Sequence, residues 1–201
     1  MTDLARSSKP GNEWTRGDLD AYNIHATPQD PATFSGTPVL PEPQVPAEIL
    51  DTLEADDMAD DEHARLIDLL DLALVPPVEP NEEDSEESVI VDFAVELFRV
   101  LGYVGRRRHA RTRKESPLPI CRETRHAKTD VCIVDRLRNR VLVLVQEDRP
   151  RGEQPEGTFA DTEALLIVQS VAAFVYNNEI RRASGLPELQ EKVYACFYCS
   201  A

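Results

Sequence analysis

The sequence of 201 residues lacks any apolar run near the roughly 20 residues that a helix needs to cross a bilayer. Its first 12 residues are polar and lack the apolar core of a secretory signal. It has only four cysteines, which do not indicate a disulfide framework in a chain of this size. We therefore expect an intracellular protein of the cytoplasm or nucleus, neither secreted nor bound to a membrane.

Cysteine is also too sparse to predict a structural zinc site. Cys196 and Cys199 form one CxxC pair, and no second pair accompanies it. Residues three apart on a strand face opposite sides, which disfavours joint ligation of one ion. The pattern favours buried thiols.

Basic residues are scarce in the first part of the chain. Up to Glu87 the sequence has 22 Asp and Glu against 4 Lys and Arg, a net charge of −18. The remainder has 15 acids against 18 bases, a net charge of +3. The acidic balance of the whole chain therefore does not exclude a nucleic-acid partner for the second half.

The first part also lacks regular hydrophobic periodicity over residues 1–45, which are rich in Pro, Ser, Thr and Asp. We expect this segment to be disordered. Residues 46–80 are acidic, and helical apolar spacing over 60–74 predicts a helix. This helix either packs on the domain that follows or is only nascent, or else it folds on a protein partner. Residues 81–87 read as an acidic linker, and the ordered domain spans 88–201.

Residues 88–201 alternate between helical and strand patterns. Ser88 and Gly102 suit the two ends of the first helix. The predicted elements are a helix over 89–101, strands over 108–114 and, shorter, 118–122, a hairpin of 128–135 with 141–148, a helix over 159–183 and a strand over 192–199. The order αβββαβ predicts an α/β fold, with a mixed central sheet flanked by helices.

Charged residues stand at the strand ends of the predicted hairpin. Asp130 lies at the start of one strand, and Glu147 and Arg149 close the other. Strand alternation places Lys128 on the face of Asp130. A hairpin that brings Asp130 near Glu147 predicts either a metal or phosphate site or a salt-bridged strand end.

The order of elements, with Asp130 on one strand and Glu147-x-Arg149 on the next, resembles the PD-(D/E)XK nuclease superfamily. Residues 87–103, an acid followed by an apolar helix ending in Leu-Gly-Tyr, are similar to the first helix of the nuclease-like domain in type I restriction enzymes. The sequence around Asp130 and Arg149 also resembles that of fungal proteins with this nuclease-like core. The resemblance covers residues 87–201 and implies a restriction-endonuclease-like fold.

The resemblance implies a role for each charged residue. Asp130 and Glu147 would bind Mg²⁺, and Glu87 would orient metal-bound water from the helix start. Arg149 occupies the position of the family's lysine; it stays charged, so it stabilises phosphate but accepts a proton poorly. Lys128 is the candidate replacement for that lysine.

A basic run follows the first predicted helix. We expect it either to contact the phosphate backbone of DNA or RNA or to protect a strand edge from pairing. Its members are Arg106, Arg107, Arg108, Arg111, Arg113 and Lys114. The function expected is a Mg²⁺-dependent phosphodiester hydrolase. The alternative is an inactive nuclease fold that serves as a binding or scaffold protein, whose acidic N-terminal segment recruits a protein partner.

Overall fold

The computed structural model of the chain places a four-stranded sheet between helices. The described residues are 6, 8–39, 42, 45–74, 83–148, 158–190 and 195–200, and the side chains of 35, 83–88, 143–148, 158–161 and 195–200 lie outside the description. In chain order the elements are η1 (Gly11–Glu13), α1 (Arg16–Ala21), α2 (Pro31–Ser35), α3 (Ala47–Asp51), η2 (Ala55–Asp57), α4 (Asp61–Leu74), α5 (Glu83–Val100), β1 (Arg108–Ile120), β2 (Glu123–Asp135), β3 (Arg140–Asp148), α6 (Thr158–Ala183) and β4 (Ala195–Ser200).

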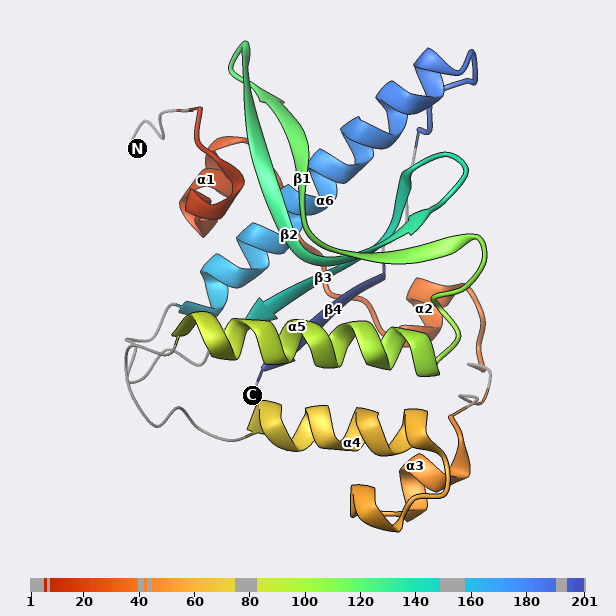
Figure 1. The fold of residues 1–201 in the computed structure, drawn as a ribbon. Helices are drawn as coiled ribbons and strands as arrows, with labels where there is room; N and C mark the ends of the chain where they lie inside the picture. Colours follow the sequence, from red (N-terminus) through yellow and green to blue (C-terminus); the bar gives the residue numbers. More distant parts are fainter. Residues whose placement is uncertain are drawn as a thin grey trace.

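The sheet is mixed and runs in the order β1-β2-β3-β4. β1, β2 and β3 pair antiparallel, whereas β4 follows α6 and pairs parallel to β3. Figure 1 shows α5 along one side of the sheet and α6 crossing the other. The chain is therefore a mixed α/β protein with helices on both faces of the sheet.

The centre of β2 is buried on both faces. Val131 and Ile133 pack with Val91, Ala94 and Phe98 of α5. Cys132 and Val134 pack instead against Ala173 of α6. An apolar run without polar alternation is typical of such a strand, and each large side chain buried there stabilises the fold by roughly 1.5–3 kcal/mol.

The structure confirms the main elements predicted for the second half and moves some of their ends. The hairpin, the long helix and the helix over residues 60–74 are present as β2–β3, α6 and α4. Gly102 follows α5 with a φ of 71°, the left-handed conformation that ends a helix. Ser88, however, lies inside α5, which begins at Glu83 within the predicted linker.

The basic region forms one long strand where two were predicted. β1 is continuous over Arg108–Ile120 and pairs with β2 along its whole length. Pro117 and Pro119 are tolerated because β1 is an edge strand, so one side of its backbone needs no partner.

The prediction of disorder over residues 1–45 is wrong for the segment that forms η1 and α1. Trp14 and Leu19 are buried in a cluster with Ala164 and Val168 of α6. A Cβ added to Gly11 would lie 2.7 Å from the Cβ of Ala127 in β2, so the backbones are in direct contact. The segment packs its few apolar side chains on α6 and on the β1–β2 hairpin. It therefore needs no regular hydrophobic periodicity of its own.

The acidic helix α4 packs on α5, which agrees with the prediction that it packs on the domain that follows. Leu66 and Ile67 of α4 are buried. Glu96 of α5, 2 % exposed, joins Arg65 of α4 at 3.0 Å and Arg99 of its own helix at 2.6 Å. Within the described part of the chain, no helix is long and apolar enough to cross a membrane.

Candidate functional site

The two central strands carry the predicted metal ligands. The β2–β3 pairing ends with Val131 opposite Val145; Asp130 directly precedes the first, and Glu147 lies two residues beyond the second. Glu87 lies near the start of α5, and Figure 1 places this start on the same side of the molecule as the end of β3. The backbone thus supplies three carboxylate positions from β2, β3 and α5.

Some of the predicted site residues lie outside the described part of the chain. The side chains of Glu87 and Glu147 lie outside the described residues, and so does the whole of Arg149. Among the described side chains, no group of three His, Cys, Asp or Glu residues is placed to hold a metal ion. Three carboxylates are nevertheless a donor set that suits Mg²⁺, a hard ion that prefers oxygen ligands.

Asp130 occupies a break in the regular alternation of β2. The β1–β2 pairing passes from Thr112–Val131 to Lys114–Thr129, and Arg113 between them has a φ of 50°. Val131 faces α5, whereas Thr129 lies opposite Lys114, whose ammonium contacts α6. Residues two apart in a regular strand share a face. The strand therefore changes face at Asp130, which is partly buried.

This break removes the basis for pairing Lys128 with Asp130 by strand alternation. The Lys128 side chain is exposed. Its backbone carbonyl accepts a hydrogen bond of 2.8 Å from Nε2 of Gln169, a buried residue of α6. This bond fixes the backbone of β2 two residues before Asp130.

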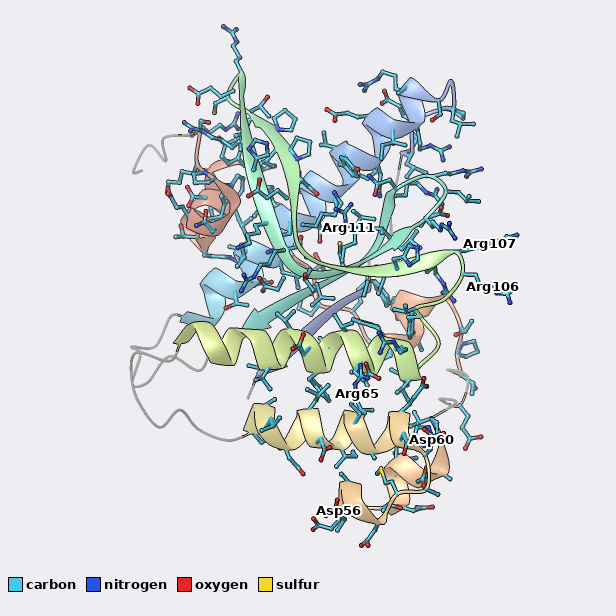
Figure 2. The ribbon with its side chains drawn as sticks, in the orientation of Figure 1. Asp56, Asp60, Arg65, Arg106, Arg107 and Arg111 are labelled. Atoms are coloured by element: carbon cyan, nitrogen blue, oxygen red, sulfur yellow. The ribbon has the colours of Figure 1, made fainter. Side chains whose placement is uncertain are left out.

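Exposed arginines gather where β1 begins and where β2 turns into β3. The backbone N–H of Arg136 donates to the carbonyl of Arg107 at 2.8 Å, so the two turns adjoin. Figure 2 shows Arg106 and Arg107 pointing outward at the edge of the molecule. We call the exposed set the arginine surface: Arg106, Arg107, Arg108, Arg111, Arg113, Arg136 and Arg138. The last two lie outside the predicted basic run, although the hairpin brings Asp135, next to Arg136, opposite Arg108.

The arginine surface has few internal counter-charges. Asp135 accepts backbone N–H groups of its own turn at 2.9 and 3.0 Å and lies 4.0 Å from Arg140. Among the described residues, Arg106, Arg107, Arg136 and Arg138 form no ion pair. Figure 2 shows Asp56 and Asp60 near η2 and the start of α4, away from Arg106, Arg107 and Arg111. The acidic segment described here does not neutralise this surface.

Lys114, the last member of the predicted basic run, does not belong to the exposed set. Its side chain is only 8 % exposed, and Nζ lies 3.9 Å from the ring centroid of Tyr176. Burial lowers the pKa of the Lys114 ammonium. The left-handed backbone at Arg113 explains the difference, because it turns the next residue toward α6.

Comparison of the chain with protein-family models, with curated proteins and with solved structures gives no match. We therefore infer its function from the sheet, the carboxylate positions and the arginine surface.

Proposed function

We propose that residues 83–200 form a nuclease-like domain of the PD-(D/E)XK type, which binds DNA or RNA and hydrolyses phosphodiester bonds with Mg²⁺. The observation that carries the proposal is the sheet itself. Its elements follow the order αβββαβ, and its neighbouring central strands hold Asp130 and Glu147. Resemblance to the superfamily rests on this order together with the acids at these positions.

Asp130 and Glu147 would hold the ion, with Glu87 assisting from α5. A bound Mg²⁺ would lower the pKa of a water molecule and stabilise negative charge on the scissile phosphate. The chain's own contribution is to fix these acids on rigid elements. The Gln169 bond to the carbonyl of Lys128 restrains the strand that carries Asp130. Lys128 and Arg149 remain the candidate cations beside the phosphate.

The arginine surface supplies the second half of the proposal. Arg106, Arg107, Arg136 and Arg138, which form no ion pair within the described part of the chain, attract a polyanion, and each contact with a backbone phosphate releases counterions. Binding should therefore weaken steeply as salt concentration rises, without strong dependence on base sequence. The fork of each guanidinium suits two phosphate oxygens at once.

A second candidate is a nuclease fold that binds nucleic acid without cleaving it. Arg149 favours this candidate because an arginine in place of the family's lysine keeps its proton. The arginine surface serves binding equally well in either case. The packing of α4 on α5 attaches this acidic helix to the folded domain.

The test is cleavage of labelled single- and double-stranded DNA and RNA by the full chain with Mg²⁺, Mn²⁺ or Ca²⁺. We expect cleavage with Mg²⁺ or Mn²⁺ that falls at least about a hundredfold in Asp130→Asn. Asp68→Asn, which changes an exposed acid of α4, is the matched control and should cleave normally. Binding without cleavage by the unaltered chain selects the second candidate. Cleavage that survives unchanged in Asp130→Asn rejects the assigned site.

A further inference from the structure

A second group of polar side chains lies between the sheet and α6. The ammonium Nζ of Lys114 stands 3.9 Å from the ring centroid of Tyr176. The Tyr176 hydroxyl oxygen accepts a hydrogen bond of 2.5 Å from Nδ2 of Asn139. The guanidinium of Arg111 reaches Oδ1 of the same Asn139 at 3.5 Å. We call Arg111, Lys114, Asn139 and Tyr176 the cationic cluster.

The backbone is distorted in a way that assembles this cluster. In a regular strand, Arg111 and Lys114 are three residues apart and point to opposite faces. The φ of 50° at Arg113 breaks the alternation, and both side chains reach partners on the α6 side. Asn139 also has a φ of 50°. Asparagine adopts this conformation readily in turns, whereas it is uncommon for arginine, and such strained positions concentrate at binding and catalytic sites.

The cluster carries two positive charges and no acid. No carboxylate lies within ion-pair distance of Arg111 or Lys114 among the described residues. The one hydrogen bond of the Lys114 ammonium, to the carbonyl of Glu115, is long at 3.4 Å. The neighbouring Cys132 supplies no negative charge, because burial raises the pKa of its thiol to about 11. Among the described residues the buried Lys114 ammonium thus has no counter-charge, an unfavourable state that a bound anion would correct.

We propose that the cationic cluster binds a phosphate group. Arg111 offers a planar fork, Lys114 offers a point charge, and the Tyr176 hydroxyl has its own hydrogen left to donate, since its oxygen accepts from Asn139. Arg111 and Asn139 are exposed and form the solvent side of the cluster, whereas Lys114 lies beneath them. These donors complement a tetrahedral oxyanion.

Phosphate binding at this cluster needs no metal ion, although Lys114 pairs with Thr129, the residue before Asp130. Asn139 directly precedes β3, whereas Glu147 lies near the other end of that strand. The phosphate belongs either to a free nucleotide or inorganic phosphate, or to the backbone of a nucleic acid. The recognition chemistry is the same in these cases, so the choice of probe distinguishes the sources.

The experiment measures binding of inorganic phosphate, a mononucleotide and a single-stranded oligonucleotide to the full chain at constant ionic strength. Titration calorimetry and thermal shift are the readouts, with chloride as the reference anion. The variants are Arg111→Gln and Lys114→Met, which remove the charge and keep an unbranched, shorter stem. Tyr176→Phe removes only the hydroxyl. Arg122→Gln is the matched control, because it removes one exposed cation at the β1–β2 turn.

We expect saturable binding of at least one phosphate probe. Removing Arg111 or Lys114 should weaken it by about tenfold or more, the loss expected for one charge-assisted hydrogen bond. Tyr176→Phe should weaken it less, and Arg122→Gln should leave it unchanged. Lys114→Met relieves a buried charge, so this variant should fold and remain informative. A phosphate response equal to that of chloride, or one that survives in both charge variants, overturns the proposal. Because no cleavage is measured, failure of the nuclease proposal leaves this test intact.

Discussion

Leu19 offers the sharpest test of how the N-terminal segment is held. Its side chain is fully buried, with a relative exposure of 0 %, among Trp14, Leu118, Ala127, Ala164 and Val168. Two of these neighbours are alanines, which have no rotatable side chain to fill a cavity. Leu19→Ala should therefore destabilise the protein by about 2–5 kcal/mol, through lost burial and a residual cavity.

The matched control is Leu53→Ala, the same chemical change at a side chain that is 85 % exposed. It should alter the free energy of unfolding by less than about 0.5 kcal/mol. A loss of about 3 kcal/mol lowers the melting temperature of a chain this long by roughly 6–12 °C. Urea denaturation and thermal melts measure both variants.

The single tryptophan adds a local probe, because Trp14 is 4 % exposed and stacks on Tyr22 with ring centroids 5.1 Å apart. Its fluorescence should be that of a buried indole in the unaltered protein. In Leu19→Ala the emission should shift to the red at a lower urea concentration. Equal stabilities for Leu19→Ala and Leu53→Ala would refute the docking of this segment.

Three further predictions concern stability. Gly11→Ala should cost about 1–3 kcal/mol in urea denaturation, because the new Cβ would lie 2.7 Å from that of Ala127; an unchanged midpoint would contradict the close backbone contact. Asn177→Leu should cost about 2–4 kcal/mol, since the buried amide bonds both the N–H and the carbonyl of Val141 at 2.9 Å; a neutral effect would show that these bonds are dispensable. Burial raises the pKa of the Cys132 thiol from 9.0 to about 11. As the pH rises, this thiol therefore loses its proton in the unfolded chain before it does so in the folded protein. The free energy of unfolding should fall between pH 9 and pH 11 for this reason. Between pH 8 and pH 10 the titration of this thiol should lower the free energy of unfolding by on the order of 1 kcal/mol, and this loss should be absent in Cys132→Ala.

The sequence predicted those elements whose own residues carry the pattern. The apolar run from Val131 and the apolar residues of α6 predict buried elements without outside help. The run 141–148, rich in valine and leucine, likewise predicted β3. Local propensity and the final fold agree at these places, which is why simple periodicity was sufficient.

Features that depend on distant partners were missed. Trp14 and Leu19 have no regular spacing, and their burial depends on α6 and the β1–β2 hairpin. The positive φ of Arg113 leaves no sequence signal, because arginine has no preference for that conformation. The burial of Lys114 and the break at Asp130 both follow from it, so strand alternation failed there for two of the predicted site residues.

The most direct test of the central claim is Mn²⁺ binding by the full chain, measured by electron paramagnetic resonance and calorimetry. Mn²⁺ takes the same oxygen ligands as Mg²⁺ and is detected directly. We predict one specific site whose affinity falls at least about tenfold in Asp130→Asn and in Glu147→Gln and is retained in Asp68→Asn. Equal Mn²⁺ affinity in all four proteins would contradict a metal site shared by β2 and β3.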